Sequence, residues 1–268
     1  MSLRQELKKT SNKRKRQEFL KRGLILAGVF MFFIIVIFFL FFIPQLRINN
    51  IAIAGADGKA AKDLENEIKS ILQNKYYYII PKDHLFFYPR DEIEALLEKK
   101  FRVQKFGIDK DYPSALKISI SEREPWALWC SAENQGKCLL IDRDGFAFEN
   151  APLTAGTAVL KIIDARNSNP LGKNILPEGD FSLLRFFIEE IPKNIDEKIS
   201  SVNIKASGKG FLIYFKTGWY AFIDNETDKD KAIQNVNLAL NNSEIKDKRS
   251  KLEYIDLRFE DKVFYKFK

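Results

Sequence analysis

The sequence predicts an α+β protein that has a single N-terminal transmembrane helix and two α+β modules beyond it. Three observations predict this class. Residues 23–43 form an apolar segment without a charged residue. Residues 47–124 alternate strand patterns with amphipathic helix patterns, and residues 125–268 are richer in strand patterns. With 46% hydrophobic and 13% aromatic residues, the 268-residue chain can bury a core, which argues against wholesale disorder.

The apolar segment has the length of a membrane span. As a helix, 21 residues rise about 31 Å, close to the roughly 30 Å hydrocarbon core of a bilayer. A buried core helix rarely runs this long without a polar position. A cleaved signal peptide needs a small-residue cleavage site, and here Pro44-Gln45-Leu46-Arg47 follows instead. We therefore interpret residues 23–43 as an uncleaved transmembrane helix.

The net charge of +8 is concentrated before this segment. Residues 1–22 carry nine of the 44 basic residues and two of the 36 acidic ones. Residues 44–268 therefore carry 35 basic and 34 acidic residues. A globally basic nucleic-acid-binding domain is therefore disfavoured, and we expect no nucleic-acid partner. Basic residues favour the inner side of a membrane, which predicts a cytoplasmic tail and extracytoplasmic residues 44–268. Attraction of the tail to anionic lipid or to a cytoplasmic partner is the alternative to a purely topological role.

The first external segment predicts the order strand, helix, helix, strand, strand. Apolar spacing predicts a short strand at 48–53 and amphipathic helices at Ala60–Gln73 and about Arg90–Lys100. Alternation and a turn at 111–114 predict the last two strands, Val103–Asp109 and Leu116–Ile120. Between the two helices lies an aromatic-rich turn region, Asn74–Pro89, which contains Tyr76, Tyr77, Tyr78, Phe86, Phe87 and Tyr88.

The second external segment begins with strands at Trp126–Cys130 and Cys138–Ile141. Asp142–Gly145 predicts a tight turn, because the third ligand and the terminal Glu of a calcium loop are absent. We expect irregular structure over Pro152–Pro177 and a helix at Phe181–Ile191 that Pro192 ends. The remaining expected elements are strands Val202–Ile204, Phe211–Phe215 and Trp219–Ile223, a helix Asp228–Asn241, and strands Leu252–Phe259 and Val263–Lys268.

The two cysteines flank a polar loop between two predicted strands. Seven residues separate Cys130 from Cys138, so the two can face each other across a hairpin. In an oxidising compartment this predicts a disulfide worth about 2–3 kcal/mol. Two reduced, half-buried thiols are the alternative. A zinc site is poorly supported because the single histidine, His84, is remote in sequence.

Several motifs together resemble the FtsQ/DivIB family of bacterial cell-division proteins. They begin with Ile51-Ala52-Ile53-Ala54-Gly55 and Tyr112-Pro113, which suit a POTRA domain placed directly after a single span. Glu122-Arg123-Glu124-Pro125-Trp126-Ala127 is similar to the family's E-R-x-P-x-A junction. Ile141-Asp142-Arg143-Asp144-Gly145 is similar to its following hairpin, and the segment from Tyr254 to Phe259 is similar to its terminal Y-x-D-L-R motif. The aromatic-rich turn departs from the family pattern.

The resemblance implies an organisation and a role. It implies a cytoplasmic tail (1–22), a span (23–43), a POTRA-like domain (47–124) and an FtsQ-type β domain (125–268). It also implies a non-enzymatic scaffold in the bacterial inner membrane, at the division septum. The implied partners are FtsB-like and FtsL-like single-pass proteins and other divisome components. Through them the family regulates septal peptidoglycan synthesis.

By the same resemblance, the partner-binding surface follows the C-terminal edge strand. A terminal strand offers unpaired backbone groups, so a partner strand can extend the sheet by β-augmentation. Arg258 could pair with a partner carboxylate, and Phe259 could be a buried anchor. The alternative is that Phe259, Val263 and Phe267 belong to the core. The implied contact residues are Arg258, Phe259, Glu260, Val263, Phe264, Tyr265 and Phe267.

Catalytic signals are weak, so we expect no catalytic site, no metal and no cofactor. His84 is interpreted as a solvent-facing turn residue. Ser114–Lys117 and Ser243–Lys246 match the S-x-x-K spacing of a Ser–Lys hydrolase, but the first enters a strand and the second a charged stretch. The glycine pattern of a phosphate-binding loop is also absent from the sequence. Two alternative functions remain: a POTRA-type envelope chaperone for unfolded clients, and a membrane-anchored cell-wall hydrolase.

Overall fold

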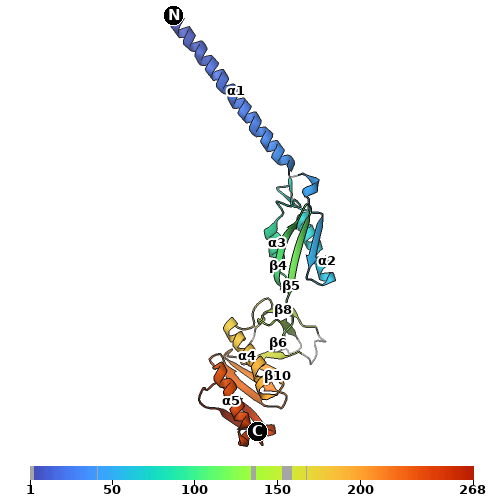
Figure 1. Ribbon diagram of the computed structural model, residues 1–268, viewed down its shortest axis with the longest axis vertical. Coiled ribbons are helices and arrows are strands. Elements are labelled where there is room, and N and C mark those ends of the chain that lie inside the picture. The colour runs from blue at the N-terminus through green and yellow to red at the C-terminus, as the bar shows by residue number, and fades with distance from the viewer. Residues whose placement is uncertain (1–2, 41, 134–136, 153–158, 167) are drawn as a thin grey trace. The chain divides into compact units, whose positions relative to one another are not determined.

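The computed structural model describes residues 3–40, 42–133, 137–152, 159–166 and 168–268 (Figure 1). The chain divides into two compact units. The first comprises Met1–Glu98 and Lys105–Ser121, and the second comprises Lys99–Gln104 and Glu122–Lys268. One apolar N-terminal helix followed by mixed helices and strands confirms the predicted α+β class.

The N-terminal helix α1 runs from Leu3 to Leu40 and contains the candidate span. Among the described residues, one segment is long and apolar enough to cross a membrane, Leu20–Phe39, with a mean hydropathy of 2.6. The helix ends earlier than the predicted 23–43 because Pro44 begins a short 3-10 helix, η1 (Pro44–Leu46). A proline disfavours helical backbone in the residue before it, and Ile43 is extended at φ −65° and ψ 115°.

The first unit has the predicted order of two helices and three sheet strands. Its elements are β1 (Asn50–Ala54), α2 (Gly58–Leu72), α3 (Arg90–Glu98), β4 (Val103–Asp111) and β5 (Ala115–Glu122). The sheet order is β1-β5-β4, with β1 parallel to β5. A small hairpin of β2 (Lys75–Tyr76) and β3 (Ile80–Pro81) lies within the aromatic-rich turn region. Periodic spacing therefore predicted the main elements but not this hairpin.

A glycine allows the close approach that ends β1. Gly55 has φ +90°, and a Cβ there would lie 1.9 Å from the backbone oxygen of Ile120 in β5. No side chain fits in that space, and glycine is the residue that adopts this φ without strain. The Ala54-Gly55 end of the strand motif is thus explained by backbone packing against the neighbouring strand.

The second unit is built on a nine-stranded sheet. The strands are β6 (Ala127–Ser131), β7 (Cys138–Ile141), β8 (Ala147–Asn150), β9 (Lys161–Asp164), β10 (Ile199–Ile204), β11 (Gly210–Phe215), β12 (Tyr220–Asp224), β13 (Leu252–Asp256) and β14 (Phe264–Phe267). Their order is β14-β13-β12-β11-β10-β9-β6-β7-β8. The last strand of the chain therefore forms one end of the sheet.

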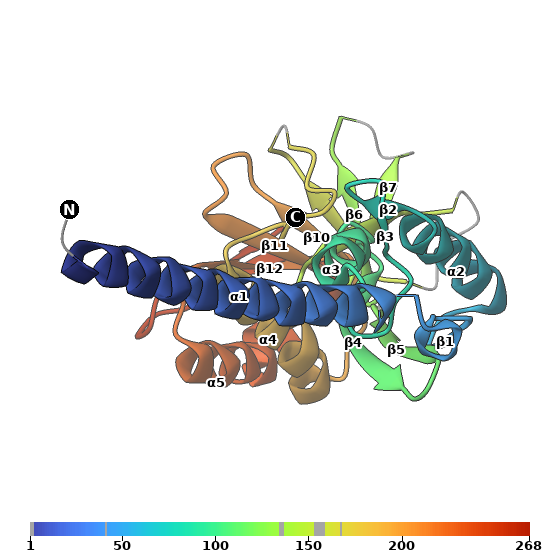
Figure 2. The same ribbon diagram turned by 90° about the horizontal axis from the view of Figure 1, so that it is seen from above.

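Helices cover one face of this sheet and bury its core. α4 (Glu178–Ile195) and α5 (Lys229–Asn241) lie side by side beneath strands β10 to β12 in Figure 2. Alternate strand residues point into this core, as Phe211, Ile213 and Phe215 do in β11. Two short helices, α6 (Ser243–Lys246) and η2 (Arg249–Lys251), precede β13.

Two expectations for the second unit are wrong. Pro192 does not end the helix: α4 continues to Ile195, and its C-cap Asp196 is left-handed at φ 51°. The last turn persists because Ile191 and Ile195 are buried in the core. The region 152–177 is not wholly irregular either. It contains β9, which pairs in parallel with both β6 and β10 and joins the two halves of the sheet.

Candidate partner-binding edge

The end of the nine-stranded sheet is formed by β14. It pairs antiparallel with β13, with Ile255 opposite Tyr265 and Asp256 opposite Phe264. Among the described residues, no strand pairs with the other edge of β14. An unpaired edge presents backbone N–H and C=O groups along its length. The strand is shorter than expected, since it begins at Phe264 and leaves Val263 in the preceding loop.

Three of the predicted contact residues expose aromatic rings at this edge. The exposed fractions are 45% for Phe259, 50% for Phe264 and 37% for Tyr265. The rings of Phe259 and Phe264 meet edge to face, with centroids 5.1 Å apart. Val263 and Phe267 are instead partly buried against the core of the unit. The edge therefore combines core-directed side chains with a small exposed aromatic pair.

Arg258 already has a carboxylate partner inside the chain. Its Nε donates to Oδ1 of Asp256 at 2.9 Å, and its Nη2 donates to Oδ2 at 2.6 Å. The guanidinium also lies 3.8 Å from the ring centroid of Phe222. The hydrogen bonds to Asp256 raise the pKa of Arg258. Arg258 thus shapes the loop after β13, and its guanidinium is already paired with the Asp256 carboxylate.

Helix α5 holds the loop that carries Phe259 and Glu260. The Asn235 amide donates to the backbone oxygens of Phe259 at 3.3 Å and of Glu260 at 3.1 Å. Lys231 pairs with the Glu260 carboxylate at 2.5 Å, and this hydrogen bond raises the pKa of Lys231. Backbone groups of an exposed loop are therefore fixed by side chains, so Phe259 has a defined position beside the strand.

Side chains of β14 are bound to their neighbours in the same way. The Tyr265 hydroxyl donates to Oε2 of Glu244 in α6 at 2.9 Å, which raises the pKa of Tyr265. Lys266 pairs with Glu253 of β13 at 2.7 Å, which raises the pKa of Lys266. These contacts hold β14 against the rest of the unit.

Sequence patterns missed most of the residues that support this edge. Asp256 lies inside the Y-x-D-L-R motif, which named this residue but not its pairing with Arg258. The other supporting residues lie far away in sequence, and no local pattern connects them with the edge: Phe222, Lys231, Asn235, Glu244 and Glu253.

The two cysteines lie toward the other end of the sheet. Cys130 in β6 and Cys138 in β7 are directly opposite in the strand register, and the structure joins them by a disulfide. They are separated from β14 by β9 to β13 in the strand order. They therefore take no part in the edge formed by β14.

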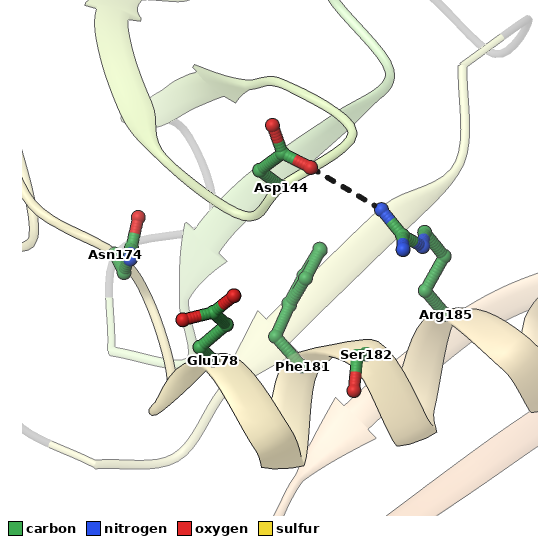
Figure 3. A pocket seen from close by; sticks show the side chains of 6 residues that line it. All are labelled: Asp144, Asn174, Glu178, Phe181, Ser182 and Arg185. Atoms are coloured by element: carbon green, nitrogen blue, oxygen red, sulfur yellow. Dashed lines mark hydrogen bonds and ion pairs between the residues drawn. The ribbon is translucent and has the colours of Figure 1, made fainter.

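A polar cavity lies between the 142–145 turn and the first turns of α4 (Figure 3). Figure 3 shows Arg185 reaching Asp144, with Nη1 and Oδ1 3.4 Å apart. The same guanidinium donates to the backbone oxygen of Arg143 at 2.5 Å. These contacts clamp the turn to the helix. In the described part of the chain, no cluster of three or more His, Cys, Asp or Glu side chains could hold a metal ion.

His84 is buried, which corrects its interpretation as a solvent-facing residue. Its exposed fraction is 2%, and its ring lies near those of Phe86 and Phe87. The backbone N–H of Phe86 donates to its Nδ1 at 3.3 Å. The physical reason is a bridge between His84 and Arg47, which draws the turn against the start of the unit.

The fold and this edge define a class of protein. Within the described residues it has one candidate membrane span and two compact units, and its C-terminal sheet ends in an unpaired edge with exposed aromatic rings. Three curated relatives to which the chain is similar are each named cell division protein FtsQ. The comparisons confirm the predicted relationship to the FtsQ/DivIB family, and the chain is related to bacterial cell-division proteins.

The similarity is modest and partial. FtsQ of Mycobacteroides abscessus is 36% identical over 103 residues, 38% of this chain and 32% of the relative. FtsQ of Bartonella bacilliformis is 36% identical over 66 residues, which are 25% of this chain and 20% of the relative. FtsQ of Chloroflexus aggregans is 26% identical over 149 residues, which are 55% of this chain and 50% of the relative. The chain thus spans half or less of the length of these relatives. No family model matches the chain.

Proposed function

We propose that this protein is a non-enzymatic scaffold of the bacterial division machinery. Its outer edge at β14 binds FtsB-like and FtsL-like single-pass partners by β-augmentation, and through them it regulates septal peptidoglycan synthesis. The N-terminal tail (1–22) lies in the cytoplasm, the span crosses the inner membrane, and the two units lie outside at the septum. The relatives' names support the division role.

The observation that carries the proposal is the position of β14 at the end of the sheet, beside exposed aromatic rings. Backbone pairing with an added strand supplies affinity, and pockets for alternate side chains supply specificity. Phe259 and Phe264 form a ready apolar contact for such a strand, because aromatic anchors dominate the energetics of many interfaces.

The backbone of β14 indicates which donors face a partner. The N–H of Lys268 donates to the backbone oxygen of Lys251, on the β13 side. Alternate residues of a strand direct their N–H groups to opposite edges. Phe264 and Lys266 therefore donate toward β13, whereas Tyr265 and Phe267 donate outward. Proline at an outward position is tolerated on an edge strand and removes one donor.

Comparison of Tyr265→Pro with Tyr265→Ala tests backbone pairing. Both variants lose the hydroxyl contact to Glu244, but the proline variant alone loses the outward N–H. We expect both to fold, and the proline variant to bind the external regions of FtsB-like and FtsL-like partners roughly tenfold more weakly than the alanine variant. Circular dichroism checks folding, and titration calorimetry with the full chain in nanodiscs measures binding.

Side-chain recognition is tested by Phe264→Lys. The matched control is Leu238→Lys in α5, since Leu238 is a 71% exposed apolar residue on another element. We expect the first variant to lose binding and the second to keep it. Equal affinity of both lysine variants, together with equal affinity of the two Tyr265 variants, would exclude β14 as the binding edge.

A further inference from the structure

We propose that the first unit docks on the outer surface of the membrane through an aromatic patch close to the end of the span. Its residues are the exposed Phe86, Phe87 and Tyr112, together with Tyr77, Tyr78 and Ile79 of the hairpin β2–β3, which we propose face the same lipid surface. The proposal rests on the predicted membrane anchor and goes beyond partner binding at β14. Its carrying observation is that the segment bearing Phe86 and Phe87 is hydrogen-bonded to the last residue of η1 and to the residues that follow it.

Backbone hydrogen bonds attach this segment to the chain as it leaves the anchor. The N–H of Leu85 donates to the oxygen of Leu46 at 2.9 Å, and the N–H of Ile48 donates to the oxygen of Asp83 at 2.7 Å. Arg47 and His84 form a β-bridge between these two contacts. Phe86 therefore directly follows Leu85, which is hydrogen-bonded to Leu46.

Chain length limits how far the patch can be from the bilayer. Helix α1 ends at Leu40, six residues before Leu46. Six residues span at most about 20–22 Å when fully extended. The headgroup layer itself extends several ångströms beyond the hydrocarbon core on each side. The segment that carries Phe86 and Phe87 is therefore tethered within about 20–22 Å of the end of α1, close enough for docking on the lipid surface.

Burial around Phe86 and Phe87 fixes them in exposed positions. Leu85 is completely buried and Tyr88 is 8% exposed, whereas Phe86 and Phe87 are 49% and 50% exposed. The buried neighbours hold the segment on the unit, with the two half-exposed rings at its surface. Tyr112, 62% exposed, extends this surface because its ring lies 6.1 Å from that of Phe86.

The hairpin β2–β3 presents two more rings. Tyr77 and Tyr78 are 90% and 95% exposed, and both have positive φ, at 48° and 62°. The N–H of Ile79 donates to the oxygen of Tyr76, which closes a turn with the two tyrosines at its centre. Such turns favour Asn-Gly, and left-handed backbone costs a bulky residue about 1–2 kcal/mol. The sequence thus places exposed tyrosines where turn chemistry disfavours them.

The chemistry of the patch suits the membrane–water interface. Tyrosine concentrates there because its ring is apolar and its hydroxyl stays hydrated. The Nζ of Lys110 lies 5.2 Å from the ring centroid of Phe86, so a cation flanks the apolar rings. Aromatic contact rather than charge is the main attraction, because two other nearby cations are paired: Arg47 with Asp83 at 3.3 Å and Lys82 with Glu92 at 2.5 Å.

Lipid quenching of an introduced tryptophan tests the docking. The full chain carrying Phe87→Trp is placed in nanodiscs of phosphatidylethanolamine and phosphatidylglycerol, with or without lipid brominated in the acyl chains. The control is Leu238→Trp, an exposed position in the second unit. We expect brominated lipid to cause a roughly twofold loss of the fluorescence added by Phe87→Trp, and little loss of that added by Leu238→Trp.

Equal, weak quenching at both positions would overturn the proposal and would point to a protein partner for the patch. Replacing phosphatidylglycerol by phosphatidylcholine is expected to leave the quenching of Phe87→Trp nearly unchanged. A loss of quenching in neutral lipid would contradict docking by aromatic contact.

A turn-optimised variant separates docking from folding. Tyr77→Asn combined with Tyr78→Gly suits the observed turn, so we expect an equal or higher thermal midpoint. Introduced into the Phe87→Trp chain, the pair is expected to reduce lipid quenching. Undiminished quenching would remove the hairpin from the patch. Partner binding at β14 is measured on the same samples, so failure of docking and failure of the proposed function remain distinguishable.

Discussion

Asp164 and Asp256 end two parallel-paired strands with the same side-chain arrangement. In each case the arginine two residues later donates to both carboxylate oxygens, at 2.9 and 2.7 Å for Arg166 and at 2.9 and 2.6 Å for Arg258. The backbone N–H of each arginine also donates to Oδ1. Both segments read Ile-Asp-x-Arg in the sequence. The motif therefore fixes the direction of the chain as it leaves a strand.

The two sites differ in burial, which predicts different costs of mutation. The Asp164 side chain is completely buried and also accepts a hydrogen bond from Nε1 of Trp129 at 3.0 Å. Asp164→Ala would leave the buried indole N–H of Trp129 without its acceptor and the Arg166 guanidinium without its carboxylate. We expect it to lower the free energy of unfolding by about 3–5 kcal/mol, measured by urea unfolding of the full chain in detergent micelles.

Asp256→Ala is the matched comparison, because Arg258 remains 32% exposed and can be hydrated. We expect a smaller cost, about 1–2 kcal/mol. Equal costs at the two sites would show that burial of the first site does not determine its contribution.

Single residues were predictable where a motif names them and not where burial decides their role. The Y-x-D-L-R pattern located Asp256 and Arg258, but it did not show that they pair with each other. His84 was interpreted from its polar, turn-rich surroundings, whereas a backbone bridge to Arg47 buries it. Exposure depends on contacts with distant segments, which no local pattern contains.

Elements were predictable in proportion to their length and periodicity. The expected helix Ala60–Gln73 corresponds to α2, in which Leu64, Ile68 and Leu72 are buried at helical spacing. In contrast, β9 has four residues, too few to establish a period, and its position in the middle of the sheet is determined by pairing with β6 and β10. A short central strand is therefore identified by its neighbours and not by its own sequence.

Pro192 shows an element whose local signal is overruled by packing. A proline inside a helix has no N–H to donate to the residue four positions earlier, here Ile188. Since α4 continues to a buried Ile195, the helix tolerates this defect in its last turn. We expect Pro192→Ala to raise the free energy of unfolding by about 1–2 kcal/mol, and with it the thermal midpoint. This gain is smaller than the roughly 3 kcal/mol that a proline costs at the centre of a helix.

Lys193→Ala controls for helix propensity, because Lys193 is an exposed neighbour in the same turn. We expect a change below about 0.5 kcal/mol for that variant. A decrease in the thermal midpoint of Pro192→Ala would mean that the proline ring supplies packing that alanine cannot replace.

At the scale of the whole molecule, the second unit includes a segment that precedes the end of the first. Residues 99–104 group with residues 122–268. Phe101 packs edge to face on Phe146, with centroids 6.4 Å apart. Arg102 pairs with Glu122 at 2.8 Å and with Glu149 at 2.9 Å. The sequence predicted two contiguous domains that meet between residues 124 and 125. Local patterns do not show that an earlier segment, residues 99–104, groups with the later domain.

The discontinuity predicts where damage at Phe101 will appear. Phe101 lies between α3 and β4 in the chain, next to elements of the first unit, but its ring contacts Phe146 and would meet a Cβ at Gly172. We expect Phe101→Ala to cost about 1–2 kcal/mol, less than for a fully buried ring because Phe101 is 41% exposed.

Hydrogen exchange of the full chain, followed by mass spectrometry, should show faster exchange in β7 and β8 and unchanged exchange in α2. Phe86→Ala, a 49% exposed ring of the first unit, should leave β7 and β8 unchanged. If Phe101→Ala instead accelerated exchange in α2 alone, the segment 99–104 would be stabilising the first unit, and the two units would be contiguous in sequence after all.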